Sequence, residues 1–302
     1  MNRTARLVLD WYERNGRSHL PWRATRDPYA VLVSESMLQQ TQVERVVPKY
    51  TAFLQRFADF PSLARADAAD VVQAWKGLGY NSRAVRLHRL AREVCERFGG
   101  QLPSDCAALG SLPGVGPYTI AAVRAFAFDQ DGAALDTNIR RVVHRVLFGL
   151  ELASPIEPAR VDARARALVP AGRARDWNSG MMDLGAQICT ARAPKCSVCP
   201  LARVCAASPV DAKQLEALRR ARVKRGGPQA RIPFRQTTRF ARGRIVDALR
   251  ELPAGNRISL LKLRASLHDA LEREENEFDA IVRALVKDGL LECDGEEVAL
   301  AR

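Results

Sequence analysis

The chain has 302 residues, of which 47% are hydrophobic, so it can fill the cores of two or three domains. Its formal net charge of +13 indicates a polyanionic partner such as nucleic acid, although a general excess of arginine would give the same charge. The first residues are too charged for a secretory signal and no run of eighteen apolar residues occurs, so we expect a cytoplasmic protein without membrane contact.

Apolar residues recur at helical spacing through most of residues 1–205, and runs that alternate as strands do are missing. Glycine and proline at residues 77–79, 98–100 and 112–114 divide this part into helices of ordinary length. The predicted fold class is therefore all-α.

A glutamate lies on the apolar face of an early predicted helix. Glu35 is three or four residues from Val31, Leu32 and Leu38, so helical geometry places these side chains on one face. Burial there would raise the pKa of the Glu35 carboxyl, as a general acid at neutral pH requires. A solvated glutamate on the helix surface is the alternative.

A glycine-rich turn, LPGVGPYT at residues 112–119, joins two apolar-patterned helices. Gly114 and Gly116 let the backbone amides of Gly114, Val115 and Gly116 approach an anion closely. Pro117 suits the first turn of a helix whose dipole is directed at the same place. The string predicts a helix-hairpin-helix that binds a DNA phosphate without reading sequence. A simple turn between two helices is the alternative.

The next helix is preceded by an aspartate. Asp136 comes before TNIRRVVHRVL and is a good N-cap, and the helix dipole would keep its carboxylate ionised. Asn138 is expected to hold this carboxylate by a hydrogen bond.

Four of the seven cysteines fall within seventeen residues, in the spacing C-x6-C-x2-C-x5-C. Clustered thiols in a reducing compartment bind metal rather than pair as disulfides. Zinc sites usually contain two C-x-x-C turns, whereas this loop has one, so the spacing favours an iron–sulfur cluster and leaves zinc or two disulfides open. The expected ligands are Cys189, Cys196, Cys199 and Cys205.

The composition changes after Cys205. Residues 219–244 contain ten Arg or Lys residues and no acidic residue, which predicts a basic linker at 208–242, lying on a phosphate backbone or disordered. The following residues, 243–302, resemble a winged helix-turn-helix, with helical patterns at 243–252, 259–271 and 276–288 and strand-like pieces at 290–293 and 298–300. Acidic residues at the start of the third helix favour a packing or partner-binding module over a DNA reader.

The helix-hairpin-helix, an aspartate eighteen residues after Tyr118 and a four-cysteine loop together resemble the endonuclease III superfamily of DNA glycosylases. Within it, the chain is most similar to the MutY-like adenine glycosylases, over about residues 7–207. The matching strings are LPWR at 20–23, SESMLQQTQV at 34–43, GLGY at 77–80, MMDLGA at 181–186 and ICT at 188–190. The resemblance implies a two-lobed glycosylase core at 1–207, with a six-helix barrel at about 22–132 and a cluster lobe formed by the N-terminus and residues 133–207.

The resemblance also implies an activity. The enzyme would hydrolyse the N-glycosidic bond of a flipped-out adenine mispaired with 8-oxoguanine or guanine, in base excision repair. Glu35 would protonate adenine N7, and Asp136, held by Asn138, would stabilise the positive charge on the sugar. The four cysteines would hold a 4Fe–4S cluster, and the partner would be mismatched or damaged double-stranded DNA, bound by a monomer.

Further residues match family positions. Tyr118 stands where related lyases carry a lysine that forms a Schiff base, so a monofunctional glycosylase is expected. Substrate contacts are implied for the gap-filling residues Gln40, Leu78 and Tyr80 and for the adenine-pocket residues Arg17, Trp22 and Arg23.

The chain departs from the family in two respects. It has no Phe-Ser-His tripeptide and no pattern for the Nudix-like domain that inspects 8-oxoguanine, and Ser179 stands where many relatives have Gln or Glu. Similar motifs, including a tyrosine at the position of Tyr118, also occur in thymine and uracil mismatch glycosylases, so that activity is the second hypothesis. A non-enzymatic iron–sulfur regulator that binds DNA is the third.

Overall fold

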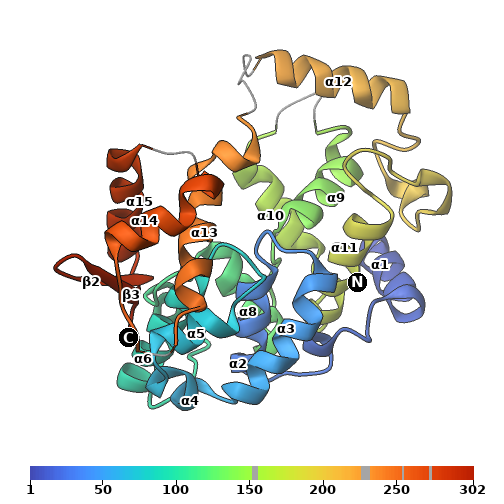
Figure 1. The fold of residues 1–302 in the computed structure, drawn as a ribbon. Coiled ribbons are helices and arrows are strands. Elements are labelled where there is room, and N and C mark those ends of the chain that lie inside the picture. The colour runs from blue at the N-terminus through green and yellow to red at the C-terminus, as the bar shows by residue number, and fades with distance from the viewer. Residues whose placement is uncertain (152–155, 226–231, 254, 272–273) are drawn as a thin grey trace. The chain divides into compact units, whose positions relative to one another are not determined.

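The computed structural model describes residues 1–151, 156–225, 232–253, 255–271 and 274–302. These residues form helices α1 to α15 and one three-stranded sheet near the C-terminus (Figure 1). The predicted all-α fold with a strand-containing C-terminal module is confirmed. None of the helices in these ranges is long and apolar enough to cross a membrane.

The chain divides into two compact units. The first unit contains residues 1–31, 104–106 and 115–229, and the second contains residues 32–103, 107–114 and 230–302. The C-terminal module thus belongs to the same unit as helices from the first third of the chain. The expected barrel, cluster lobe and separate module follow other boundaries and stay a prediction.

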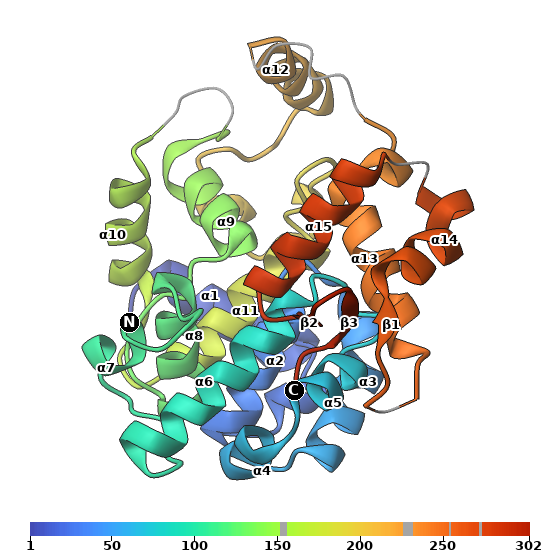
Figure 2. The ribbon, with the colours of Figure 1, turned by 60° about the vertical axis from the view of Figure 1, so that its left-hand side comes forward.

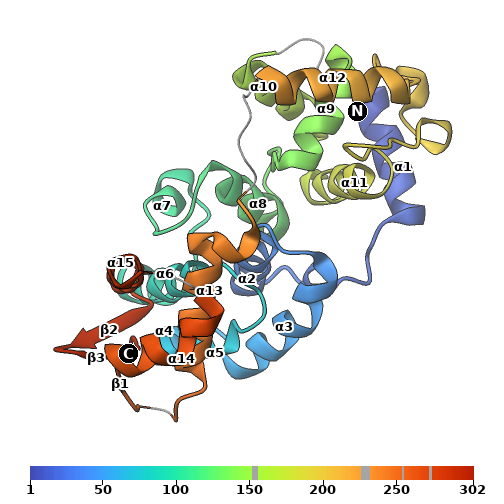
Figure 3. The ribbon, with the colours of Figure 1, turned by 45° about the horizontal axis from the view of Figure 1, so that its top comes forward.

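The first unit has a core shared by several helices. α11 contacts α1, α8 and α9, and α10 contacts α9 (Figure 3). Trp177 and Met181 of α11 are buried there with Ile139 of α9. A Cβ at Gly180 would lie 2.9 Å from the Val8 side chain, so the close packing of α1 on α11 requires glycine. The bounds are α1 (Arg3–Asn15), α8 (Pro117–Phe128), α9 (Thr137–Phe148), α10 (Pro158–Leu168) and α11 (Ala174–Gln187).

The second unit begins with helices that pack around α6, which contacts α4 and α5 (Figure 2). α4 starts where the Asp59 carboxylate accepts a hydrogen bond from the Ser62 amide (2.7 Å). Phe53 and Trp75 pack edge to face in the core, with ring centroids 5.9 Å apart. The bounds are α3 (Val43–Arg56), α4 (Phe60–Arg65), α5 (Ala68–Ala74) and α6 (Ser82–Phe98); α2 (Pro28–Leu38) and α7 (Cys106–Gly110) contain residues of both units.

The C-terminal module consists of three helices and an antiparallel sheet in the order β1–β3–β2. α13 contacts both α14 and α15. The three predicted helices and two predicted strands are confirmed, whereas β1 was missed because it has only two residues. The bounds are α13 (Thr238–Arg250), β1 (Ile258–Ser259), α14 (Leu260–Leu271), α15 (Glu275–Lys287), β2 (Leu291–Asp294) and β3 (Glu297–Leu300).

A buried arginine attaches the module to the rest of the second unit. Arg250 is 6% exposed and donates hydrogen bonds to the Val72 carbonyl (2.7 Å) and to the Asn81 side chain (3.0 Å). An ion pair between Lys76 and Glu251 lies nearby, but both side chains are exposed, so it contributes little. The buried contacts of Arg250 therefore fix the module.

The predicted basic linker contains a helix. α12 (Ala212–Arg225) was missed because the positive charge of this segment was weighed and its helix-forming Ala, Lys, Gln, Leu and Arg residues were not. Glu216 and Arg220 add an i,i+4 pair. The described part of the helix runs to Arg225, and residues 226–231 lie outside the described residues.

Candidate active site

Glu35 is buried in the second half of α2. Its exposed fraction is 6%, and the neighbouring Leu32 is 1% exposed. The helix begins at Pro28, and the Asp27 carboxylate accepts hydrogen bonds from the amides of Tyr29 (3.1 Å) and Ala30 (3.2 Å). Glu35 is therefore buried and is not a solvated glutamate on the helix surface, whereas apolar surroundings of its carboxyl stay a prediction.

A buried guanidinium connects the end of α2 to two loops. Arg83 of α6 donates hydrogen bonds to the carbonyl oxygens of Ser36 and Met37, both at 2.8 Å. It also donates to the Thr41 hydroxyl and the Gly79 carbonyl, both at 3.0 Å. Burial lowers the pKa of Arg83 to about 10, so it stays ionised at neutral pH. The helix that carries Glu35 and the loops around residues 40 and 80 are thus held together.

Gln40 and Tyr80 have left-handed backbones within these two loops. Their φ angles are 56° and 47°, a conformation that is uncommon and costly for residues other than glycine. Both residues line one cavity of about 820 Å³, together with Leu78. The structure therefore brings the three predicted gap-filling residues together, although Leu78 is only 4% exposed.

Asp136 is the N-cap of α9. Its carboxylate accepts hydrogen bonds from the Ile139 amide (2.6 Å) and from Nδ2 of Asn138 (2.9 Å), which confirms the predicted cap and the predicted contact with Asn138. Burial raises the pKa of the Asp136 carboxyl, and the hydrogen bonds only partly oppose this rise. Lost hydration therefore outweighs the cap and helix-dipole effects that favour the ionised form.

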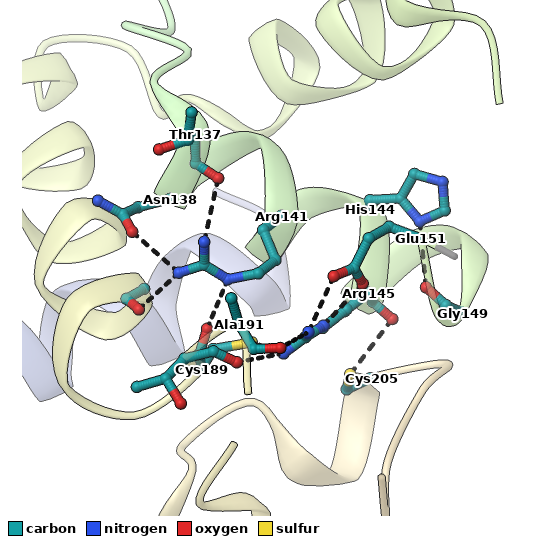
Figure 4. Close-up of polar contacts among 12 residues, drawn as sticks. Thr137, Asn138, Arg141, His144, Arg145, Gly149, Glu151, Cys189, Ala191 and Cys205 are labelled. Atoms are coloured by element: carbon teal, nitrogen blue, oxygen red, sulfur yellow. Dashed lines mark hydrogen bonds and ion pairs between the residues drawn. The ribbon is translucent and has the colours of Figure 1, made fainter. Parts of the chain in front are cut away.

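Arg141 connects Asn138 to the cysteine loop (Figure 4). It donates hydrogen bonds to Oδ1 of Asn138 (2.9 Å), to the Gly185 carbonyl (2.7 Å) and to the Cys189 carbonyl (2.8 Å). A Cβ at Gly185 would lie 2.6 Å from the Asn138 Cβ, so this close approach of α11 to α9 requires glycine. A continuous set of hydrogen bonds therefore runs from the Asp136 carboxylate to the backbone of Cys189.

Arg145 lies beside Cys189, Ala191 and Cys205 of the cysteine loop (Figure 4). Its side chain is 1% exposed and pairs with the Glu151 carboxylate through Nε (2.8 Å) and Nη2 (2.9 Å). It also donates to the Thr190 carbonyl (2.8 Å) and lies 3.5 Å from Sγ of Cys189. The Cys205 thiol donates to the Arg145 carbonyl (3.3 Å). Arg145 thus contacts one end of the loop through its guanidinium and the other end through its backbone carbonyl.

The four clustered thiols line one small cavity and are all free. Burial raises the pKa of Cys199 to about 11 and also raises the pKa of Cys205, so metal binding has to displace protons from these thiols. Within the described residues, no group of three or more Cys, His, Asp or Glu side chains has the geometry to hold one metal ion.

Two of the predicted adenine-pocket residues bind a buried aspartate. Arg17 donates to Asp183 through its backbone amide (2.8 Å) and through Nε (2.9 Å) and Nη2 (2.8 Å). Nη2 of Arg23 lies 3.5 Å from the same carboxylate. Nε and Nη1 of Arg23 are buried and have no hydrogen-bond partner among the described residues. Trp22 is 7% exposed. Arg23 therefore has two buried donors that no described residue satisfies, whereas Arg17 is occupied by Asp183.

The glycine-rich turn has the expected backbone. α8 begins at Pro117 with Gly116 as its N-cap, and Gly114 has a φ of +79°. Val115 is 9% exposed, whereas Gly114 is exposed and Gly116 is half-buried. Tyr118 lies half-buried in the first turn of α8. The helix start is confirmed, and phosphate binding stays a prediction.

Comparison with known proteins gives consistent matches. Residues 33–169 match the HhH-GPD superfamily of base excision DNA repair proteins. An adenine DNA glycosylase of Mycolicibacterium smegmatis is 35% identical, over 94% of this chain and 91% of the relative. One of Mycobacterium tuberculosis is 36% identical, over 94% and 88%. The chain belongs to the adenine DNA glycosylase family.

Solved structures agree with the adenine DNA glycosylase family fold. A thermostable thymine-DNA glycosylase is 35% identical with a TM-score of 0.63, covering 67% of this chain and 93% of that protein. Endonuclease III in a non-covalent complex with DNA has a TM-score of 0.59 at 20% identity, covering 71% and 95%. The predicted helix-hairpin-helix glycosylase fold is confirmed.

Residues 189–205 match the iron–sulfur binding domain of endonuclease III. This match decides the question that the cysteine spacing left open, because it assigns a cluster rather than zinc or disulfides. The residues fit such a group: four thiols line one cavity, and the Arg145 guanidinium lies beside Cys189, where it can offset thiolate charge.

Several polar residues that contact the predicted site residues or the cysteine loop were not found from the sequence. They are the buried Arg83, Arg145 and Asp183 and the half-buried Arg141. Asp183 lies within the MMDLGA string, which matches the family, so the sequence marked this position. Its partner Arg17 is 166 residues away, so the contact between them could not be predicted. Contacts of this kind depend on the fold and cannot be read from spacing along the chain.

Proposed function

We propose that the protein is a monofunctional adenine DNA glycosylase that hydrolyses the N-glycosidic bond of adenine mispaired with 8-oxoguanine or guanine. The observation that carries this proposal is the similarity, over 94% of the chain, to enzymes named adenine DNA glycosylase.

Glu35 is the proposed general acid. Adenine is a poor leaving group until a ring nitrogen is protonated, so a carboxylic acid has to donate a proton, at N7, as the glycosidic bond breaks. The burial of Glu35 in α2 supports this role, because loss of hydration favours the protonated form of a carboxyl group.

Asp136 is the proposed stabiliser of the sugar cation. Bond cleavage leaves positive charge on the sugar, which a fixed carboxylate can offset. The hydrogen bonds from Asn138 and the Ile139 amide support this role because they fix the carboxylate and oppose its protonation.

The adenine has to leave the base stack before it can react. Gln40 and Tyr80 are proposed to fill the vacated space, and their strained backbones and the Arg83 contacts support a fixed placement of both loops. Arg23 and Trp22 are proposed adenine contacts, and the two unpartnered donors of Arg23 support this.

The proposed enzyme binds double-stranded DNA as a monomer in the cytoplasm, at the nucleoid. The amides of residues 114–116 are the proposed phosphate contact, and the net charge of +13 favours the polyanion. Tyr118 has no amine with which to form a Schiff base, so strand cleavage is not expected. The iron–sulfur cluster is proposed as a brace that fixes the cysteine loop and, through Arg141, the Asn138 side chain.

The test is single-turnover base release from duplexes that pair A with 8-oxoguanine, A with G, T with G or U with G. Release of adenine without strand cleavage is expected. Binding without release from any duplex would contradict enzymatic function.

A thymine or uracil mismatch glycosylase is the second candidate, because the solved thymine-DNA glycosylase is 35% identical to this chain. Release of thymine or uracil, with no release of adenine, would establish it instead.

A further inference from the structure

The cavity next to Gln40 and Tyr80 is completed by the C-terminal module. Its volume is about 820 Å³, within the usual range of about 300–1,000 Å³ for sites that enclose a small ligand. One side is formed by the loops that carry Gln40 and Tyr80, and the other by Phe234, which precedes α13, and by Arg239 and Arg244 of α13. All of these residues belong to the second compact unit.

Aromatic rings and a guanidinium form a ladder along this cavity. The Arg239 guanidinium lies 3.8 Å from the centroid of the Tyr80 ring and 5.8 Å from that of Phe234. Phe234 packs edge to face on Phe240 at 5.5 Å, and yet it is 58% exposed. Exposed aromatic and guanidinium planes are the surfaces on which proteins stack unpaired bases.

The charge of the cavity suits a phosphate. Arg239 and Arg244 both line it, and neither has a carboxylate partner within the described part of the chain. The Asp247 carboxylate also lines the cavity, but it accepts a hydrogen bond from Arg250 (2.7 Å). The net field is therefore positive beside the stacking surfaces.

We infer that this cavity binds one unpaired purine nucleotide of DNA, the partner of the excised adenine, with its base stacked in the ladder of Tyr80, Arg239 and Phe234. The identity of the nucleotide rests on the proposed function, since Gln40 and Tyr80 would enter the stack beside that base. Phe234, just before α13, and Arg239 of α13 are then the residues that contact the opposite base.

The test is equilibrium binding of the full chain to duplexes that contain a non-hydrolysable 2′-fluoro-adenosine. The position opposite is 8-oxoguanine, guanine or an abasic analogue. The wild type binds the duplexes with an opposite base more tightly. Phe234→Ala and Arg239→Ala each weaken that binding by roughly 5- to 100-fold, the usual loss for a stacked base, and change binding to the abasic duplex less than roughly twofold.

The matched control is Arg235→Ala, which removes an exposed arginine of the same segment that does not line the cavity. It lowers affinity for all duplexes equally or not at all. Phe234→Ala is decisive because it changes no charge. Equal losses on base-containing and abasic duplexes, or no loss on either, overturn the inference. The binding measurement does not depend on base release. A wild type that releases no adenine would therefore contradict the proposed function, while the difference in binding between base-containing and abasic duplexes could still be measured.

Discussion

Asp136 caps a helix and carries a charge, and two substitutions separate these properties. Asparagine caps helices as well as aspartate does, so Asp136→Asn keeps the start of α9 and removes the charge. We expect adenine release to fall by roughly 10²-fold or more, as for other fixed electrostatic contacts. Asp136→Ala also loses the cap, which costs about 1 kcal/mol of stability. Single-turnover rates and thermal unfolding of both variants check this.

The raised pKa of Asp136 determines how folding stability depends on pH. Burial raises the pKa of the Asp136 carboxyl in the folded state above its ordinary value of 3.8. The contribution of this group to folding stability is therefore fully present below pH 3.8 and is lost as the pH rises through the folded-state pKa. Ionised Asp136 therefore costs stability at neutral pH. Asp136→Asn should unfold at the wild-type temperature or above it at pH 7. Unfolding as early as the alanine variant would show that the cap needs the charge.

Tyr118 determines whether the DNA strand is cut. Tyr118→Lys places an amine in the first turn of α8, where it could attack the sugar carbon and form a Schiff base. We expect a covalent complex trapped by borohydride with this variant and none with the wild type. Trapping by the wild type would contradict the monofunctional assignment.

The cysteine loop depends on its contacts with Arg145. Arg145→Met leaves the Glu151 carboxylate and the Thr190 carbonyl without their donor. Breaking a buried pair costs about 3–5 kcal/mol, and we expect the lower end because Glu151 is 22% exposed. Iron content per chain and unfolding free energy should both fall. Arg192→Gln, in the exposed part of the loop, is the matched control and should change neither.

The two loops with left-handed residues depend on Arg83. A lysine ammonium cannot reach all the acceptors of the Arg83 fork, and unsatisfied buried carbonyls cost about 1–3 kcal/mol each. Arg83→Lys should lower both the unfolding temperature and adenine release, while iron content stays unchanged. Arg86→Lys, on the exposed side of the same helix, should change none of these. Adenine release by Arg83→Lys at the wild-type rate would show that the two loops keep their conformation without the Arg83 hydrogen bonds.

Elements with strong local signals were predictable. The starts of α8 and α9 follow from Pro117 and Asp136, and the burial of Glu35 follows from its helical spacing. α12 was missed because charge composition does not report helix propensity. The Arg83 and Arg141 contacts could not be predicted, because each joins segments that are 40 or more residues apart in the chain.

At the scale of the whole molecule, the sequence predicted the family and its fold, and its domain boundaries stay a prediction. The C-terminal module lies in one compact unit with residues 32–103. The hydrogen bonds of Arg250 to Val72 and Asn81 hold the module there and cannot be recognised in the local sequence pattern. The module is therefore expected to influence the loops at residues 40 and 80 rather than act as a tethered domain.

The central claim is that a buried acid on α2 protonates the adenine that leaves. The most direct measurement is single-turnover base release from a duplex with A opposite 8-oxoguanine, comparing the wild type with Glu35→Gln. Glutamine keeps the shape of the side chain but cannot donate a proton as the bond breaks. We predict a loss of roughly 10²- to 10⁴-fold in rate, with binding to the 2′-fluoro duplex unchanged. Adenine release by Glu35→Gln within tenfold of the wild-type rate would contradict the account.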